Sequence, residues 1–311
     1  MAVVIVSYNV RALLRDCLES LRNSACRYRF RVIVVDNRSK DGSAEMVREE
    51  FPEVKLIVSA DNGGFAAGNN QGIRAAQGAR YVMLLNPDTV VPAQALEGLL
   101  DFMESHPEAG VVGPKLVKAD GQLDLACRRS FPDPKTAFYH AFWLDRLFPQ
   151  SREFGRYNLT FLDEDQLAEV DCVVGAAMLV RAEAVERAGL LDEAFFMYGE
   201  DLDWAFRISE AGWKVFYNPA VVIVHYTGQS SRQRSVRSTL AFYDAMMIFH
   251  RTHYAARTLF AANWAIAAGI GLRCLMALTG NLFHQQTLPW GRRPRLPGAE
   301  GPAMPPAEQA P

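Results

Sequence analysis

Short apolar runs alternate with segments of helical spacing through the first third of the chain. Between residues 10 and 22, apolar side chains recur at the three- and four-residue spacing of a helix that buries one face. Residues 41–50 show a second helix start, with Asp41 or Ser43 available as its cap. Apolar runs rich in β-branched residues predict strands at residues 3–6, 31–35, 54–58 and 81–85. This alternation predicts a parallel sheet that helices cover on both faces.

The rhythm changes after residue 110. We expect a strand at 111–117, further ordered structure at 170–180, a helix near 201–210, and strands near 213–216 and 220–224. The segment 127–169 between them is aromatic and dotted with proline, and it fits either a long loop or lid or buried irregular structure. The half from 111 to 235 is therefore expected to be mixed α+β.

Two segments of different character complete the chain. Residues 239–283 are apolar and helical in pattern, and residues 289–311 are rich in proline, glycine and alanine, which predicts a disordered tail. We therefore expect a domain at 1–235 with halves 1–110 and 111–235, a helical extension at 236–288, and a tail at 289–311.

Composition narrows the functional classes. The 311 residues include 33 basic and 35 acidic side chains, so the net charge of −2 provides no basic field for nucleic acid. The five cysteines are scattered without a CxxC pair, which argues against a disulfide framework or a structural zinc site and fits a reducing cytosol. The apolar run at residues 1–6 is too short, and too uncharged at its start, for a signal peptide.

Polar side chains follow four of the predicted strands. Ligands bind beyond the carboxyl ends of strands in open α/β sheets, so these segments line one rim of the sheet. Together they favour a ligand with several hydrogen-bonding groups, such as a nucleotide, although Asp36 could equally cap the next helix. The glycine-rich run from Asn62 to Gly72 fits a phosphate cradle or a tight strand-to-helix connection. The four segments are Ser7-Tyr8-Asn9, Asp36-Asn37-Arg38-Ser39, Asp61-Asn62-Gly63-Gly64 and Asn86-Pro87-Asp88-Thr89.

Three further positions are candidates for metal binding or proton transfer. Asp88, which follows a proline turn at a strand end, suits a hard divalent ion, although aspartate is also common in ordinary turns. His225 ends an apolar strand and is either a metal ligand or a structural histidine. Glu200-Asp201 opens a helix after the aromatic run 195–198, where a carboxylate could act as a general base or simply complement the helix dipole.

Taken together, these segments resemble the inverting family 2 glycosyltransferases with the GT-A fold, especially the rhamnosyltransferase-like and galactofuranosyltransferase-like members. The matching pieces cover roughly residues 2 to 230 in the family's order. The resemblance implies an α/β, Rossmann-like GT-A fold, with a mixed, mainly parallel sheet flanked by helices and a C-terminal helical extension. The matching segments are 4–9, 34–43, 62–72, 84–88, 174–181, 191–193, 195–203 and 219–225.

The resemblance also implies roles for individual residues. Asp201 matches the catalytic base, with Glu200 beside it, and Asp88 and His225 match the ligands of Mg²⁺ or Mn²⁺. Asn86 departs from the family's Asp-x-Asp motif, which leaves fewer negative charges for the ion. The residues expected to bind the nucleotide-sugar donor are Val6, Ser7, Asn9, Asp36, Asn37, Asn62, Gly68, Asn70 and Asn86.

The resemblance implies a single displacement in cell-envelope polysaccharide synthesis. The donor favoured is dTDP-rhamnose, followed by UDP-hexoses or UDP-galactofuranose, and the acceptor is a hydroxyl of a glycan or lipid-linked saccharide. A catalytically inactive nucleotide-sugar-binding protein and a nucleotidyltransferase are the alternatives. A nucleotidyltransferase is expected to carry a glycine-rich, basic loop near its N-terminus, which the segment 7–11 lacks.

The helical extension is expected to touch the inner face of the plasma membrane from the cytoplasm without spanning it. Its apolar stretch at residues 258–272 is fifteen residues long, bounded by Arg257 and Arg273, and a bilayer core requires about 20. Basic residues on either side could meet anionic headgroups. The alternative is that this helix packs on the catalytic domain or on a second subunit of a homo-oligomer.

Overall fold

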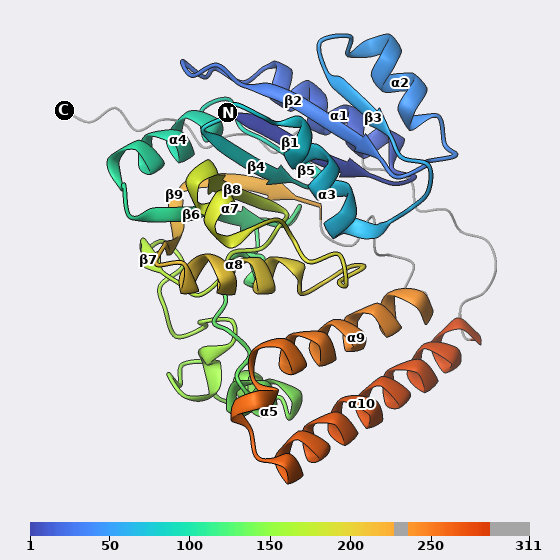
Figure 1. The fold of residues 1–311 in the computed structure, drawn as a ribbon, viewed down its shortest axis with the longest axis vertical. Helices are drawn as coiled ribbons and strands as arrows, with labels where there is room; N and C mark the ends of the chain where they lie inside the picture. The colour runs from blue at the N-terminus through green and yellow to red at the C-terminus, as the bar shows by residue number, and fades with distance from the viewer. Residues whose placement is uncertain (227–235, 287–311) are drawn as a thin grey trace.

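The computed structural model describes residues 1–226 and 236–286. The predicted tail at 289–311 lies outside the described residues. One sheet forms the centre of the molecule, and Figure 1 shows helices on both of its sides. Strands β5, β7 and β8 run against the direction of the other six, so the sheet is mixed and mainly parallel, as the sequence predicted.

The N-terminal half is a parallel array in the order β3-β2-β1-β4. Right-handed crossovers place α1 and α2 on one face and α3 on the other, because the connection from β3 to β4 runs back across the sheet. Gly72 lets α3 lie close to β1, since a Cβ there would come within 2.2 Å of Val4. The elements are β1 (Ala2–Ser7), α1 (Arg11–Arg22), β2 (Arg31–Asp36), α2 (Ser43–Glu50), β3 (Lys55–Val58), α3 (Gly64–Ala75) and β4 (Tyr81–Leu85).

The second half extends the same sheet in the order β8-β6-β9-β5. The two strands predicted at 213–216 and 220–224 are one strand, β9. Its pairing with β6 shifts by three residues after Asn218, and this irregularity accommodates Pro219, which cannot donate to the ladder. The elements are β5 (Thr89–Val90), α4 (Ala95–Ser105), β6 (Ala109–Val117), β8 (Ala177–Arg181), α7 (Ala182–Ala188), α8 (Glu200–Glu210) and β9 (Lys214–His225).

The aromatic segment that the sequence left open contains short helices and one short strand. Asp133 caps α5 by accepting a hydrogen bond from the Thr136 backbone N–H. Several of its aromatic side chains are exposed, including Phe138, Phe142 and Phe148. The elements are η1 (Leu125–Cys127), α5 (Pro134–Ala141), α6 (Leu144–Leu147), η2 (Phe154–Arg156) and β7 (Ala168–Glu169), which pairs with β9.

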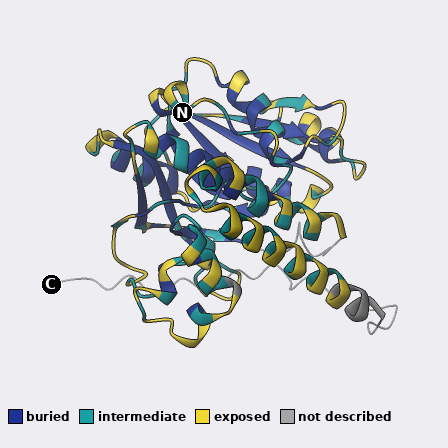
Figure 2. Ribbon diagram, turned by 60° about the horizontal axis from the view of Figure 1, so that its bottom comes forward, coloured by how far each residue is buried: buried dark blue, intermediate teal, exposed yellow. Residues whose placement is uncertain are grey.

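The C-terminal helices α9 (Val236–His253) and α10 (Phe260–Gln286) lie side by side, joined by η3 (Ala255–Arg257). Helix α9 packs on α8, where Phe249 and His253 contact the ring of Phe206. Helix α10 packs on α9, and its Arg273 lies over the ring of Trp143. Figure 2 shows that much of the rest of its surface is exposed.

The apolar stretch of α10 is longer than the sequence analysis expected. It does not end at Arg273, because the helix continues through Leu275 and Met276, and the stretch Phe260–Gly280 is long and apolar enough to cross a membrane. None of the residues in this stretch is buried. Length and composition therefore permit a span as well as a surface contact.

Candidate active site

The carboxyl ends of β1 and β2 meet at one rim, and their loops are tied together by hydrogen bonds. The Asn9 backbone N–H donates to Ser39 Oγ at 2.9 Å, and the Lys40 N–H donates to Asn9 Oδ1 at 2.7 Å. Asp36 Oδ1 accepts from the Ser39 N–H at 2.8 Å. Its Oδ2 is buried and finds no hydrogen-bond partner among the described residues, which suits a ligand that supplies a donor.

A second group of side chains holds the start of α3 against this rim. Asn37 Nδ2 donates to the Gly64 carbonyl at 2.9 Å and lies 3.4 Å from Asn62 Oδ1. Gly64 has a φ of +89°, and a Cβ there would collide with the carbonyl oxygen of Phe196. The glycine thus allows the N-terminus of α3, a favourable place for a phosphate, to lie directly against the loop before α8.

The other residues predicted to bind the donor lie along α3 and β1. Ser7 Oγ is buried without a hydrogen-bond partner in the described ranges. Gly68 packs tightly on Val6, since a Cβ would come within 2.7 Å of that side chain. Asn70 points elsewhere, because its amide bonds the backbone of Leu191 and the Glu193 carboxylate. Here Asn70 fastens the loop before α8 to α3, so its predicted role in donor binding is not visible in its contacts.

The carboxyl end of β4 brings Asn86 and Asp88 together with His225. His225 Nε2 lies 3.3 Å from Asp88 Oδ1 and 3.4 Å from Asn86 Nδ2. Its Nδ1 lies 3.0 Å from Asp124 Oδ2. Burial lowers the pKa of His225, but hydrogen bonds with Asp124 and Asp88 raise it more, to about 9. The imidazole is therefore protonated at neutral pH when no ion is bound.

This arrangement fits a divalent ion. Asp124 orients the imidazole from behind, as carboxylates do for metal-binding histidines, and leaves Nε2 directed at Asp88. In the described part of the chain no group of three His, Cys, Asp or Glu side chains could hold an ion by itself. Asp88 and His225 would thus share the ion with the donor's phosphates, as Mg²⁺ sites commonly do. Metal binding at Nε2 would also require the loss of its proton.

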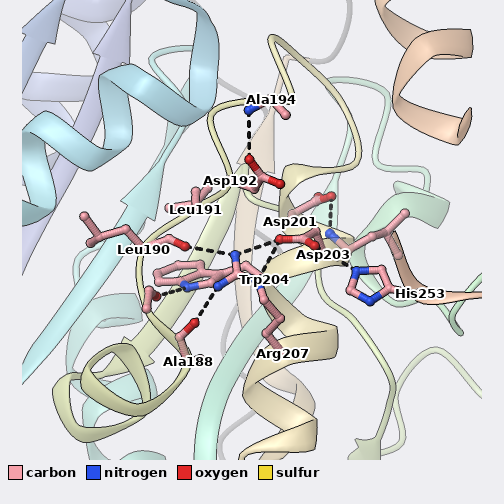
Figure 3. Close-up of polar contacts among 12 residues, drawn as sticks. Ala188, Leu190, Leu191, Asp192, Ala194, Asp201, Asp203, Trp204, Arg207 and His253 are labelled. Atoms are coloured by element: carbon pink, nitrogen blue, oxygen red, sulfur yellow. Dashed lines mark hydrogen bonds and ion pairs between the residues drawn. The ribbon is translucent and has the colours of Figure 1, made fainter. Parts of the chain in front are cut away.

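Three carboxylates occupy the first turn of α8, and all three are buried. Asp203 faces α9 and the body of the helix, where it accepts hydrogen bonds from Arg207 and lies 2.8 Å from His253 Nε2 (Figure 3). Burial alone would raise the pKa of Asp203, but His253 and Arg207 lower it below its usual value. Its partners give Asp203 a structural role, fixing α8 against α9.

Asp201 has different neighbours. Its Oδ2 accepts hydrogen bonds from Arg129 at 2.6 Å and from the Gly175 backbone N–H at 3.0 Å, and its Oδ1 accepts from the Leu202 N–H at 2.8 Å. A carboxylate has about four acceptor positions, so one remains for a further hydroxyl. The Arg129 guanidinium is itself buried, and the pair forms a fixed ionic contact beneath the site.

Glu200 directly precedes Asp201 but lies in a very different environment. Burial and, after it, the negative charge of Asp201 raise the pKa of Glu200 to about 8. Its Oε2 is buried and has no hydrogen-bond partner within the described ranges. At neutral pH Glu200 is therefore mostly protonated, whereas the neighbouring Asp201 is paired with Arg129.

The segment before β8 lies between the carboxylates Glu200 and Asp201 and the rim of polar strand ends. A Cβ on Gly175 would lie 3.2 Å from the ring of Phe65 and 3.6 Å from the Asp201 Cβ. One residue later, the Ala176 carbonyl accepts a hydrogen bond from the Asn86 backbone N–H at 2.9 Å. The start of α3, the Asn86–Asp88 turn and the start of α8 therefore converge, and they bring most of the predicted site residues to one place.

Comparison with known proteins shows the family to which this chain belongs. The family model for glycosyl transferase family 2 matches residues 2–186, more than half of the chain. The chain belongs to glycosyltransferase family 2. The four polar strand ends that form the rim all lie within the matched residues.

Relatives within family 2 support this membership. The N-acetylglucosaminyl-diphospho-decaprenol L-rhamnosyltransferase of Mycobacterium tuberculosis is 27% identical over 96% of this chain and 97% of its own length. Rhamnosyltransferase WbbL of Escherichia coli is 24% identical over 74% of this chain and 84% of its own. The mannosyltransferase PcManGT of Pyrobaculum calidifontis, solved with GDP-Man and Mn²⁺, superposes with a TM-score of 0.55 at 18% identity, covering 93% and 75% of the two chains. That likeness confirms the GT-A fold.

Two residues of this glycosyltransferase site escaped the sequence analysis. Arg129 lies in the aromatic segment whose structure the sequence left open, and Asp124 lies between a turn and a short 3₁₀ helix. Neither position carries a periodic or motif signal. Only the fold brings them to Asp201 and His225, over 72 and 101 residues of sequence.

Proposed function

We propose that this glycosyltransferase moves L-rhamnose from dTDP-rhamnose to a hydroxyl of a lipid-linked saccharide, with inversion at the anomeric carbon. The observation that carries the proposal is the position of Asp201, a buried carboxylate fixed by Arg129 and Gly175 next to the donor rim. Two of the relatives, from Mycobacterium tuberculosis and Escherichia coli, are rhamnosyltransferases, which supports the choice of sugar.

In this mechanism Asp201 accepts the proton of the acceptor hydroxyl. The hydroxyl oxygen then forms its bond to the anomeric carbon on the face opposite the leaving nucleoside diphosphate, so no covalent enzyme intermediate is needed. Arg129 and the Gly175 N–H hold the Asp201 carboxylate in one orientation throughout. Protonated Glu200 avoids a second negative charge beside the base.

Asp36, Ser7 and the start of α3 would bind the nucleoside diphosphate. Asp36 Oδ2 and Ser7 Oγ offer buried, unsatisfied hydrogen-bonding groups to the base or ribose. Asp88 and His225 would hold Mg²⁺ or Mn²⁺, which neutralises charge that grows on the leaving diphosphate. The Mn²⁺ in the mannosyltransferase complex supports a divalent ion for this site.

The location that goes with this function is the inner face of the plasma membrane, reached from the cytoplasm. The exposed apolar surface of α10 supports membrane contact, since Trp264 is 65% and Leu272 is 61% exposed. A lipid-linked acceptor would be presented at that surface.

The test is a panel of donors offered to the purified full-length enzyme with Mg²⁺ or Mn²⁺. The panel contains dTDP-rhamnose, UDP-hexoses and UDP-galactofuranose, each with a prenyl-diphosphate-linked saccharide as the acceptor. We expect transfer from dTDP-rhamnose, with product of the opposite anomeric configuration by NMR and loss of activity in excess chelator. Transfer of another sugar would contradict the proposal that dTDP-rhamnose is the donor. Retained anomeric configuration would contradict the inverting mechanism. Donor binding without transfer from any member would indicate an inactive binding protein.

A further inference from the structure

A groove of about 480 Å³ runs between α9 and α10, within the size range of small-molecule sites. Most of the side chains that line it are apolar. Both helices contribute, and the loop before α8 closes one part of it. The apolar lining residues include Phe196, Leu240, Met247, Ala267, Ile270 and Cys274.

The groove adjoins the active site through Phe196. This residue stands four positions before Glu200, and its carbonyl accepts a hydrogen bond from the Phe65 backbone N–H at 2.8 Å. One wall of the groove is thus the loop that also touches the start of α3 on the donor side. A ligand lying in the groove would have one end close to the carboxylates of α8.

The positive charge at the end of the groove next to Phe196 suits a phosphorylated ligand. Arg237 lines the groove and places its guanidinium 4.3 Å from the centre of the Phe196 ring. Asp244 lines the groove about two helical turns further along α9, which is ~10 Å away by helix geometry. The positively charged end of the groove therefore lies at the loop before α8.

Beside the groove, α10 presents an exposed apolar surface. The outward face of α10 carries the exposed side chains Trp264, Leu272, Leu275 and Met276. Arg273 is the one charged residue between positions 260 and 280. A long hydrocarbon chain leaving the groove across α10 would therefore meet apolar side chains, and a membrane could lie on the same face.

We infer that this groove holds the prenyl chain of a diphosphate-linked acceptor, with Arg237 at the end where the diphosphate lies. The inference rests on the proposed function, because it assigns the acceptor of that same site. Apolar lining, a cation at the catalytic end and an exit onto an exposed apolar helix match a prenyl diphosphate. The relative from Mycobacterium tuberculosis is an N-acetylglucosaminyl-diphospho-decaprenol L-rhamnosyltransferase, which supports this class of acceptor.

The first test compares two acceptors that carry the same saccharide on a decaprenyl or a geranyl diphosphate. Ala267 lines the groove, whereas the neighbouring Ala268 does not line it and is exposed. Ala267→Trp should fill the groove and raise the KM for the decaprenyl acceptor by about tenfold or more, with a smaller effect on the geranyl acceptor. The control Ala268→Trp should leave both KM values unchanged. Equal effects of Ala267→Trp on both acceptors would overturn the inference.

The second test does not depend on sugar transfer. A decaprenyl diphosphate with a photoreactive group in its chain should cross-link to peptides of α9 and α10, in competition with unlabelled decaprenyl diphosphate but not with inorganic diphosphate. Ala267→Trp should lose this labelling and Ala268→Trp should retain it. Labelling outside the groove would refute the inference, as would a shift in oligomeric state with Ala267→Trp by light scattering, which would make the groove a subunit interface. Labelling without transfer from any donor would instead refute the proposed function alone.

Discussion

Arg129 and Asp201 form a buried ion pair that fixes the proposed base. Removing one partner of such a pair leaves the other charged and unpaired, so we expect Arg129→Met to lower the free energy of unfolding by about 3–5 kcal/mol. The double variant Arg129→Met/Asp201→Asn should recover part of this loss. Urea denaturation measures both effects.

The partly exposed pair Arg15–Glu50 provides the control for this prediction. Arg15→Met should cost about 0–1 kcal/mol, because solvent screens a pair at the surface. If Arg129→Met were equally mild, the ionic contact would not be what holds Asp201.

Glu200 makes the stability of the enzyme depend on pH. Its pKa is about 8 in the folded protein, against an ordinary value of 4.5, so between these values the folded state keeps a proton that the unfolded chain releases. The contribution of this one group to stability should therefore fall as pH rises from about 5 to about 8. Glu200→Gln should remove that fall.

The measurement is urea denaturation of the wild type and the variant across this pH range. Glu210→Gln, at the exposed far end of α8, serves as the control and should follow the wild type. Parallel pH profiles for wild type and Glu200→Gln would show that Glu200 is ionised like an ordinary glutamate.

For individual residues, the sequence could predict those that belong to short motifs, but it could not predict which side chains they contact. Asp88 follows one strand and His225 ends another, and the structure brings their side chains to 3.3 Å. Asn70 lies in the predicted donor loop, yet its amide faces the loop before α8. A helix turns each residue by about 100° from the last, so a motif cannot tell which face an individual side chain will occupy.

A buried polar contact between His253 and Asp203 joins α9 to α8. His253→Ala would leave the Asp203 carboxylate with Arg207 alone. We expect faster amide hydrogen exchange in α9, because the lost contact costs about 1–3 kcal/mol, while β1 and β4 keep their protection. Arg251→Ala, at an exposed position on the same helix, should not change the exchange. Unchanged protection of α9 in His253→Ala would mean that the aromatic packing alone holds it.

The regular elements were predictable because each carries a local pattern. The strand at Tyr81–Leu85 has the predicted bounds, and α1 and α8 differ from the prediction by one residue at one end. The segment 127–169 was not predictable, because its short helices are held by contacts with distant residues, such as Arg128 with the carbonyls of Leu162 and Asp163. Such contacts leave no periodic trace in the sequence.

For the whole molecule, the exposed α10 predicts attachment to membranes. Full-length protein should float with anionic vesicles, because α10 offers apolar side chains and the basic residues Arg251, Arg257 and Arg273 can meet anionic headgroups. Leu272→Glu/Leu275→Glu should abolish flotation, while the exposed Leu167→Glu, distant in sequence, should not. High salt should weaken the association.

Two results would contradict surface attachment. Protein that stays at the bottom of the gradient in every case would make α10 a packing or oligomer surface. Protein that remains with the vesicles in high salt and at alkaline pH would make α10 a membrane-spanning helix, which the length of Phe260–Gly280 permits.

The central claim for the whole enzyme is that Asp201 takes the proton from the acceptor. The most direct measurement compares sugar transfer and donor binding in Asp201→Asn and wild type, with circular dichroism as the check on the fold. The asparagine keeps the shape and an acceptor oxygen for Arg129 but cannot take a proton, so transfer should fall by about 10²–10⁴-fold while donor affinity stays the same. Transfer within about threefold of wild type, in a folded variant, would contradict the account.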